Sequence, residues 1–370
     1  NTQRFERFHF KQFSERSDYI RCIDEDARGK LWLGSANGAI IFDPVTKKSE
    51  LLKLPTDASS KALVYSLRSI LVDGSTVWIG TDMGLYRYDY ESKAFQVYCK
   101  SDELGTIPDN SVSALAKHPK TGDIIVGNRN GALSVLSLAT EHFIRMELPL
   151  SDPAEISCLF FDKDRKLWVS TRGEGIFSYL ENQRKFTNYQ SEINNPNSLS
   201  SNFVKTIFQD RSGVLWFSTA YKGLSRFNPV SQSFASPLKE AGYIPVSANG
   251  GAINRIAIDS KDNLWLGTDK GVVWVNQTTN TFKAYRHDKK NKNSLADNGV
   301  NSIYVDPADQ VWVATERFQH LNPQTGAVEM FDFLPNEQMP SPPSHIPRRD
   351  FVAGRIVFDL HPIGDGRLYI

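Results

Sequence analysis

The stretch that decides the fold is Gly213-Val214-Leu215-Trp216-Phe217-Ser218-Thr219-Ala220-Tyr221-Lys222-Gly223-Leu224, because its phrase returns along the whole chain. Copies of it surround Trp32, Trp78, Trp168, Trp265 and Trp312, a weaker copy has Ile125 in the tryptophan position, and a last one has Tyr369. The successive spacings are 46, 47, 43, 48, 49, 47 and 57 residues. A repeat of this length that is built only from strand-like segments predicts a β-propeller, in which each repeat forms one blade.

Each repeat contains four strand-like pieces, which predict an all-β fold of four-stranded blades. An F-x-x-[YF] piece such as residues 95–98 is the expected outermost strand, and an apolar piece such as residues 204–207 is the innermost. The tryptophan strand and a Gly-Leu-x-x-[FY]-[DN] strand complete the set. Because a blade packs on its neighbours through both faces, we interpret the tryptophans as packing between blades. The glycine two positions after several of them should leave room for a bulky neighbour.

Blade number and domain boundaries follow from the same repeats. Seven complete repeats predict a seven-bladed propeller over residues 1–333, with eight blades as the alternative. Residues 334–350 hold five prolines and are expected to form a linker. Residues 351–370 restart the repeat, either as a truncated second propeller or as an extra blade. The strand expected at residues 5–8 would close the ring. Because the last repeat stops inside its tryptophan strand, we expect the chain to be a fragment.

Composition excludes several classes of protein. Lysine and arginine number 43 against 42 acidic residues, so a net charge of +1 gives no global attraction to nucleic acid or to an anionic membrane. The chain has no run of 18 apolar residues that would span a bilayer. Three cysteines, Cys22, Cys99 and Cys158, are too few for a disulfide scaffold and are expected to be thiols, two of them small buried side chains.

The chemistry of common enzymes is absent from the sequence. There is no HExxH zinc motif, no Walker loop, no GxSxG elbow and no paired-cysteine metal site. The seven histidines are scattered without metal-ligand spacing, and the acidic turns lack the twelve-residue spacing of an EF-hand. We therefore predict a domain without catalysis, metal or cofactor.

A binding site is predicted where the repeats disagree. The loop before the innermost strand and the loop after the tryptophan strand emerge at the same end of a blade, the end where propellers usually take ligands. The predicted ligand-binding residues are Arg21, Arg68, Arg172, Tyr221, Asn254, Arg255, Asp269 and Arg317. Guanidinium groups offer five fixed donors and suit an anionic or hydroxyl-rich ligand. The alternative is that these are solvated loop charges, paired with Asp82, Glu174 and Asp269.

The repeat phrases resemble the two-component regulator propeller repeat of bacterial sensor proteins. That pattern runs from N-S-L-S-x-N-x-V, seen at residues 197–204, through D-x-x-G-x-L-W to G-L-x-R-[FY]-[DN], seen at residues 84–89. The resemblance covers nearly the whole chain and is weak in the third repeat. It implies the extracytoplasmic part of a hybrid histidine kinase or diguanylate cyclase, facing the periplasm, with a membrane helix and a signalling module downstream. It also implies a small-molecule or glycan ligand and a homodimeric full-length receptor.

Three functional hypotheses stay open at this point. The leading one is a sensor domain, in which ligand binding biases a downstream signalling module. The second is a protein–protein scaffold that senses no small molecule. The third, less favoured, is a carbohydrate-active enzyme, which would need two convergent carboxylates about 5–9 Å apart.

Overall fold

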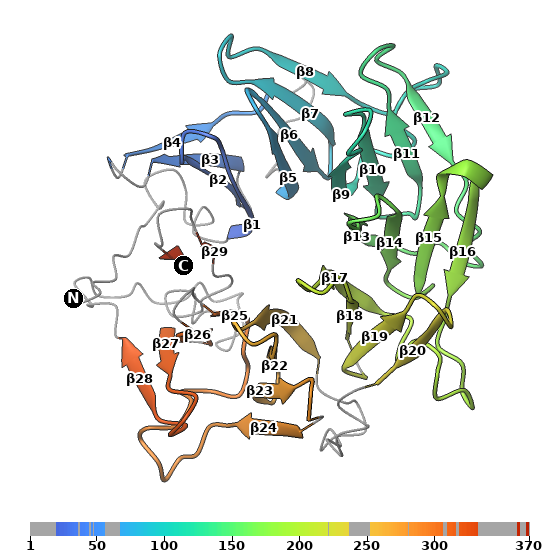
Figure 1. Ribbon diagram of the computed structural model, residues 1–370. Coiled ribbons are helices and arrows are strands. Elements are labelled where there is room, and N and C mark those ends of the chain that lie inside the picture. Colours follow the sequence, from blue (N-terminus) through green and yellow to red (C-terminus); the bar gives the residue numbers. More distant parts are fainter. Residues whose placement is uncertain are drawn as a thin grey trace, which may run out of the picture. The chain divides into compact units, whose positions relative to one another are not determined.

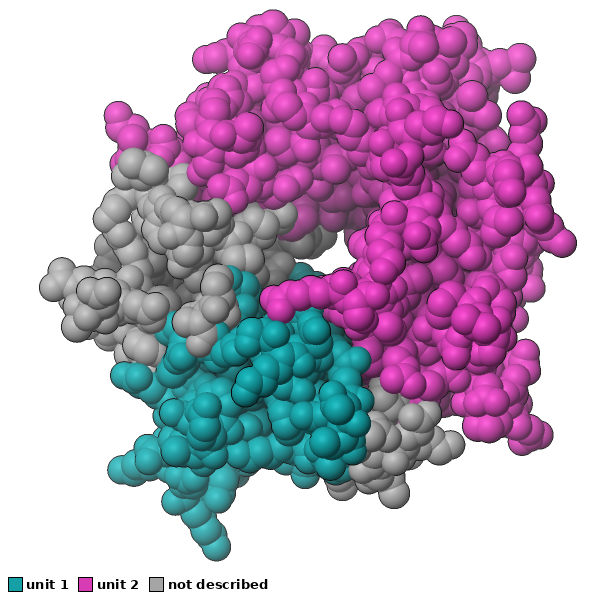
Figure 2. Space-filling view, viewed as in Figure 1, with its two compact units in different colours: residues 1–9, 238–370 teal, residues 10–237 magenta. Residues whose placement is uncertain are grey.

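A computed structural model describes residues 20–35, 38–43, 46, 48–55, 67–220, 222–236, 252–279, 281–305, 309–315, 318–331, 361–362 and 368–369. The chain divides into two compact units, residues 10–237 and residues 1–9 with 238–370, which Figure 2 shows in different colours. The predicted strand at residues 5–8 and the predicted linker at 334–350 lie outside the described residues.

The unit of residues 10–237 contains five four-stranded antiparallel sheets, each a meander of consecutive strands (Figure 1). Their strands are β1 (Ile20–Glu25), β2 (Leu31–Ser35), β3 (Gly38–Asp43) and β4 (Lys48–Leu52); β5 (Leu67–Asp73), β6 (Thr76–Thr81), β7 (Gly84–Asp89) and β8 (Phe95–Tyr98); β9 (Val112–Lys117), β10 (Ile124–Asn128), β11 (Leu133–Leu136) and β12 (Phe143–Met146); β13 (Ile156–Phe161), β14 (Leu167–Thr171), β15 (Ile176–Leu180) and β16 (Lys185–Tyr189); and β17 (Val204–Gln209), β18 (Leu215–Thr219), β19 (Leu224–Asn228) and β20 (Ser233–Ala235). The 3₁₀ turn η1 (Glu181–Gln183) joins β15 to β16. The first strands of successive sheets contact one another from β1 to β17, so they are the inner strands of blades.

The second unit contains two four-stranded sheets and a short strand pair. Their strands are β21 (Ile253–Ile258), β22 (Leu264–Thr268), β23 (Gly271–Asn276) and β24 (Thr281–Tyr285); β25 (Ser302–Val305), β26 (Val311–Ala314), β27 (Phe318–Leu321) and β28 (Val328–Phe331); and β29 (His361–Pro362) with β30 (Leu368–Tyr369). The seven four-stranded sheets correspond to the seven complete repeats, and the predicted seven-bladed, all-β propeller is confirmed. Whether residues 351–370 begin a second propeller stays a prediction.

The tryptophans pack between blades, as predicted. Trp32, Trp78, Trp168, Trp216 and Trp265 are at most 2% exposed. Trp32 lies in a cluster with Leu67 and Ile79 of the next sheet, and Trp265 lies in one with Val311 and Val313 of the sheet that follows it. Burying a side chain of this size contributes about 3 kcal/mol or more per site, so these rings account for much of the blade-to-blade cohesion.

The aspartate in the hairpin before the tryptophan forms a hydrogen bond with the indole ring in several sheets. In four sheets the aspartate six residues earlier accepts a hydrogen bond from the indole Nε1–H, at 2.7–3.3 Å; the pairs are Asp26–Trp32, Asp162–Trp168, Asp210–Trp216 and Asp259–Trp265. The other carboxylate oxygen accepts backbone N–H groups of the same turn, as Asp162 does from Asp164 and Lys166. One side chain therefore both shapes the turn and satisfies the buried donor.

Two sheets depart from this arrangement. The second sheet has a shorter turn, and Trp78 Nε1 is buried without a hydrogen-bond partner. In the third sheet Ile125 replaces the tryptophan and has no donor to satisfy. There His118 Nδ1 accepts the N–H groups of Lys120 and Thr121 in place of an aspartate.

The glycine after the tryptophan is required by a close approach of the next sheet. A Cβ at Gly127 would lie 2.6 Å from Ile156 Cγ2, and one at Gly267 would lie 2.8 Å from Val300 Cγ1. Both contacts are shorter than carbon atoms tolerate. The predicted room for a bulky neighbour is confirmed.

Three loops between sheets share one architecture, and we call them clasp loops: residues 100–110, 191–202 and 287–298. In each, an asparagine near the end bonds back to the first N–H, as Asn298 Oδ1 does to His287 N at 2.8 Å. A buried aliphatic residue, Ile107, Leu199 or Leu295, is at most 1% exposed. A loop carbonyl then accepts an N–H from the next sheet's outermost strand, as Asn293 O does from Val328 N at 2.8 Å. The N-S-L-S-x-N phrase is thus a structural tie between neighbouring blades.

The cysteines are thiols, as expected. Cys22 and Cys158 are half-buried on β1 and β13, and Cys99 is exposed. They are therefore less buried than the sequence predicts.

Candidate functional site

The candidate site lies at the end of the sheets where the inner strand begins and the second strand ends, which we call the mouth end. The residue before the inner strand accepts a backbone hydrogen bond, at 2.9–3.2 Å, from the residue that follows the second strand. The acceptor–donor pairs are Ser111–Arg129, Glu155–Arg172, Phe203–Ala220 and Ala252–Asp269. This bond sets two variable positions side by side in each of these four sheets.

Arg68 and Asp82 form the first charged pair of the mouth end in residues 10–237. Arg68 Nε donates to Asp82 Oδ1 at 2.5 Å, and Ser111 Oγ of the next sheet donates to the same oxygen at 3.1 Å. Burial opposes ionisation of Asp82, but the hydrogen bond and the positive charge of Arg68 outweigh it, so the pKa of this carboxyl lies below its usual value. The carboxylate is thus held charged and in place.

Glu155 links the next two sheets. Its carboxylate lies 3.6 Å from Arg129 Nε and 3.8 Å from Arg172 Nε. The Glu155 side chain is 16% exposed, whereas those of Arg129 and Arg172 are 49% and 60% exposed. The half-buried acid therefore positions two guanidinium groups that are themselves largely exposed to solvent.

The side-chain contacts form two groups, Arg68 with Asp82 and Ser111, and Glu155 with Arg129 and Arg172. A backbone hydrogen bond from Arg129 N to Ser111 O joins the two groups, and we call the six residues the mouth belt. Three cations and two anions leave it with one net positive charge. Such a belt offers alternating hydrogen-bond donors and acceptors rather than a strong positive field. Phe203, 43% exposed, forms a backbone bridge with Arg172 at one end of the belt and adds an apolar surface.

In the unit that contains β21–β28, the predicted residues are held differently. Asn254 Nδ2 donates to Val300 O at 2.8 Å, and so joins β21 to the segment that leads into the next inner strand, β25. Ser113 and Ser157 hold the same position in their sheets and make the same kind of bond, at 2.7 Å. This position is therefore a link between inner strands wherever a short polar side chain occupies it. Its hydrogen bond leaves Asn254 less free for a ligand.

The remaining predicted residues fall into two groups. Arg255 lies on β21 half-buried, and Asp269 is exposed, with its backbone N–H bonded to Ala252. Tyr221, Arg317 and the side chain of Arg21 lie outside the described residues. The structure thus joins Arg68 and Arg172 in the mouth belt, and the roles of the other predicted residues stay predictions.

Sequence reasoning missed Ser111 and Glu155, the two residues that join neighbouring sheets within the belt. A usable signal existed, since each stands immediately before the first residue of an inner strand. The alternative interpretation, arginines paired with nearby acids, describes Arg68 with Asp82 correctly. For Arg172 the acid is Glu155, not Glu174, whose carboxylate instead accepts Ser151 N and Gln190 Nε2.

Neither a metal centre nor a membrane span is found in what the structure describes. No three His, Cys, Asp or Glu side chains of the described residues gather in a way that would hold an ion. Among those same residues, no helix has the length and apolar character needed to cross a bilayer.

Comparison with known proteins gives matches to a sequence family and to solved folds. The family described as "Two component regulator propeller" matches residues 14–37, 198–221 and 294–317. No curated protein matches the chain in sequence.

Among solved structures, the extracellular domain of the putative hybrid two component system BT4673 from B. thetaiotaomicron superposes with a TM-score of 0.56 at 16% identity. The match covers 96% of this chain and 50% of that domain, so the chain spans half of its length. Virginiamycin B lyase from Staphylococcus aureus superposes with a TM-score of 0.56 at 16% identity, covering 81% and 92% of the two chains. YCF48 bound to D1 peptide gives a TM-score of 0.53 at 12% identity, covering 86% and 92%.

At these identities the superpositions establish the fold alone. The three segments that match the family model each contain a tryptophan of the repeat, Trp32, Trp216 or Trp312. These three segments are therefore two-component regulator propeller repeats.

Proposed function

We propose that the chain is the extracytoplasmic ligand-sensing domain of a bacterial two-component signalling protein and that it binds a small polar molecule at the mouth end of its blades. The single observation that carries the proposal is the mouth belt. It holds exposed guanidinium donors on a half-buried acid at the positions where the repeats differ from one another. Residues that only build blades have no reason to differ in this way.

The chemistry of the belt favours a neutral, hydroxyl-rich ligand, such as a glycan fragment, over a strong anion. Each of its arginines already lies within 4 Å of a carboxylate, which cancels most of the positive charge. What remains are directional donors from Arg129 and Arg172 and acceptors from Asp82 and Glu155. A polyol matches such an alternation, because every hydroxyl both donates and accepts.

The belt supports binding rather than catalysis. Virginiamycin B lyase has a similar fold and is an enzyme, so the fold itself does not decide the matter. A carboxyl that acts as a general acid needs a raised pKa, whereas the pKa of Asp82 is lowered by Arg68. The proposed domain is accordingly not an enzyme, and the chemical output belongs to a kinase or cyclase module elsewhere in a full-length, dimeric, membrane-anchored receptor.

A panel of oligosaccharides and metabolites, screened by thermal shift, tests the proposal. A ligand should raise the melting temperature of the wild-type chain and not that of Arg172→Ala, because the variant loses the most exposed guanidinium of the belt. Arg145→Ala is the matched control, since Arg145 is 64% exposed on the outer strand β12, away from the mouth end. A ligand that stabilises all three proteins equally would bind elsewhere and contradict the proposal.

The second candidate function is a scaffold that docks a peptide. It draws support from the half-exposed Phe203 beside Arg172 and from the similar fold of YCF48, which is bound to a peptide. Phe203→Ala separates the two functions. Loss of a protein partner in this variant, with no small molecule stabilising the wild type, would favour the scaffold.

A further inference from the structure

Arg172 and Phe203 are partners in an antiparallel bridge that joins the turn after β14 to the residue before β17. The backbone N–H groups of both residues bond elsewhere, and the bridge is made one position on, where Gly173 N donates to Asn202 O at 3.1 Å. In a pair of this kind the Cα atoms lie about 4.5 Å apart and both side chains project from the same face. The side chains of Arg172 and Phe203 therefore begin side by side, although they belong to neighbouring sheets.

The backbone beneath this pair is fixed on both sides. Arg172 N donates to Glu155 O, and Ala220 N donates to Phe203 O, each at 2.9 Å. The Glu155 carboxylate also lies 3.8 Å from Arg172 Nε, so the guanidinium is held as well as its backbone. A ligand would meet a surface that is already ordered, and binding would cost little additional ordering of the loops.

The side chain of Phe203 is exposed at a position that does not require a ring. Phe203 is 43% exposed, and it is the one aromatic among the seven exposed large hydrophobic residues of the described part of the chain. The matching residue is Ser111 in the third sheet, Glu155 in the fourth and Ala252 in the sixth, and each accepts the same backbone hydrogen bond. Because this bond uses only the backbone carbonyl, building the blade does not need a phenyl group here.

The pair combines an apolar face with polar groups at its edge. A phenyl ring binds a flat apolar group by stacking. The Arg172 side chain is 60% exposed and presents guanidinium N–H donors beside the ring, while the Glu155 carboxylate presents acceptors. Oxygen substituents at the edge of a stacked ring would meet both kinds of group. An open-chain molecule has no comparable flat face.

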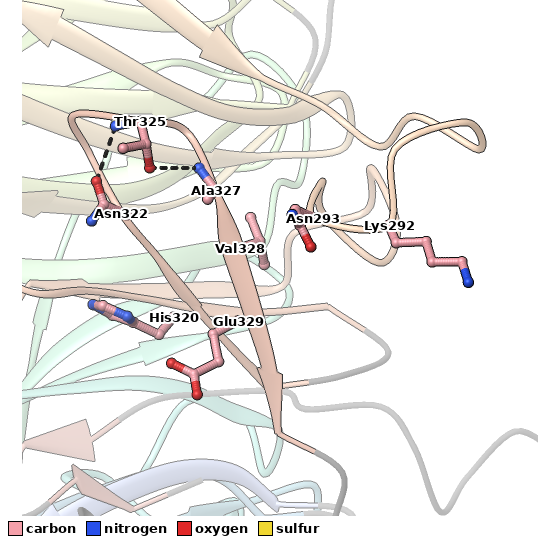
Figure 3. Close-up of a pocket in the computed structure, with 8 residues that line it drawn as sticks. All are labelled: Lys292, Asn293, His320, Asn322, Thr325, Ala327, Val328 and Glu329. Atoms are coloured by element: carbon pink, nitrogen blue, oxygen red, sulfur yellow. Dashed lines mark hydrogen bonds between the residues drawn. The ribbon is translucent and has the colours of Figure 1, made fainter.

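A hollow in the second unit shows what such a pair adds. The hollow measures about 630 Å³ and is lined by the third clasp loop and by the hairpin of β27 and β28. In Figure 3, Asn322 and Lys292 lie at opposite ends of it, and the Lys292 side chain is directed away. The hollow therefore offers space without converging side chains, whereas the bridge sets Arg172 and Phe203 next to each other.

We propose that Phe203 and Arg172 form a subsite for a ring-shaped ligand, which stacks on the phenyl face and hydrogen-bonds its edge to the guanidinium and to Glu155. The inference rests on the function proposed above and narrows it. The ligand at the mouth end is cyclic, with one face of C–H groups and oxygen substituents at its edge. Phe203 selects a ring over a chain, and Arg172 binds the polar edge of either.

Saturation-transfer difference NMR on the whole chain, with myo-inositol and sorbitol as separate probes, tests the proposal. The two molecules have the same number of carbon and oxygen atoms, but one is a ring and the other an open chain. We expect myo-inositol to bind in the millimolar range and sorbitol at least about fivefold more weakly, the effect of losing one stacking contact. Saturation of the protein's aromatic protons should pass to the C–H groups of myo-inositol.

Three variants locate the contact. Phe203→Ala should reduce the affinity for myo-inositol to that for sorbitol and leave sorbitol binding unchanged, a pattern that damage to the fold would not produce. Phe203→Tyr keeps the ring and should keep the preference. Val230→Ala removes another exposed apolar side chain, from the turn between β19 and β20 at the opposite end of the sheet, and should change nothing.

The outcomes separate the subsite from the function proposed above. Equal affinity of the wild type for both probes, lost for both in Arg172→Ala, would overturn the subsite and keep a binding site at the mouth end. A preference for myo-inositol that persists in Phe203→Ala would show that the ring binds elsewhere. Failure of the wild type to bind myo-inositol would also overturn the subsite, and the ligand panel alone would then decide the proposed function.

Discussion

Replacing Asp210 by alanine tests whether the aspartate and tryptophan of a repeat act as one unit. Asp210 is 5% exposed, and its Oδ2 accepts Trp216 Nε1–H at 2.8 Å while its Oδ1 accepts Val214 N at 2.9 Å and Ser212 Oγ at 2.6 Å. In the variant the indole donor stays buried without a partner, which costs about 1–3 kcal/mol. The two turn hydrogen bonds contribute about 1 kcal/mol each. The free energy of unfolding should therefore fall by about 3–5 kcal/mol.

The second sheet supplies the matched control. Asp73 is the acidic residue of its shorter turn, and Trp78 Nε1 already lacks a partner there. Asp73 Oδ1 instead accepts Lys117 Nζ at 2.5 Å, with both side chains partly exposed, and such a surface pair contributes about 0–1 kcal/mol. Asp73→Ala should therefore cost much less than Asp210→Ala.

The free energy of unfolding of both variants is measured by urea unfolding, followed by far-ultraviolet circular dichroism. If the slope of this free energy against urea concentration is unchanged, the variants expose the same surface on unfolding as the wild type. Trp216→Phe removes the orphaned donor, so Asp210→Ala should cost less in the Trp216→Phe background than in the wild type. Equal losses for Asp73→Ala and Asp210→Ala, or strict additivity in the double variant, would show that the hydrogen bond between Asp210 and Trp216 contributes nothing.

Three further predictions concern acid, packing and the clasp. Burial opposes ionisation of Asp26 and Asp259, but their hydrogen bonds lower both pKa values below the usual 3.8. The stability that the two carboxylates contribute is therefore complete above about pH 4 and is lost as the pH falls through their pKa values in the folded protein. The free energy of unfolding, measured with urea at pH 5, 4 and 3, should fall with pH, and a constant value would contradict the assignment. Gly127→Ala places a Cβ against Ile156 and should cost about 1–3 kcal/mol by overpacking, seen as a lower melting temperature. Leu295→Ala should cost about 2–5 kcal/mol in urea unfolding, because the third clasp loop loses its buried side chain; a loss below 1 kcal/mol would show that its backbone bonds hold it alone.

The periodic parts of the sequence were enough to predict the blades. A repeat of this length must bury a fixed set of side chains between blades. That requirement predicts the strand order, the buried position of Trp32 and Trp265, and the need for a glycine at Gly127. The bond between Asp210 and Trp216 was not predicted, because a separation of six residues becomes a contact only when a particular hairpin joins the two strands.

The candidate site was harder to predict because its contacts cross between repeats. Glu155 meets Arg129 and Arg172 although the three residues belong to two repeats, and only the register of neighbouring sheets brings them together. Asn254 looked like a ligand-facing residue because it follows the first residue of an inner strand, yet its amide bonds the segment that leads into the next inner strand. Side-chain pairing of this kind depends on geometry that the repeat pattern does not contain.

The clasp loops have a consequence for how the protein unfolds. The outermost strand of a blade is bonded to the loop that precedes the blade, as Val328 is to Asn293 and Phe234 is to Asn197. This strand cannot detach unless the loop shared with the neighbouring blade opens as well. In a repeat protein, the energy of such nearest-neighbour contacts sets how many units melt together. Hydrogen exchange of the N–H groups of Val328 and Phe234 should therefore report the cooperative opening of two blades rather than the fraying of one strand.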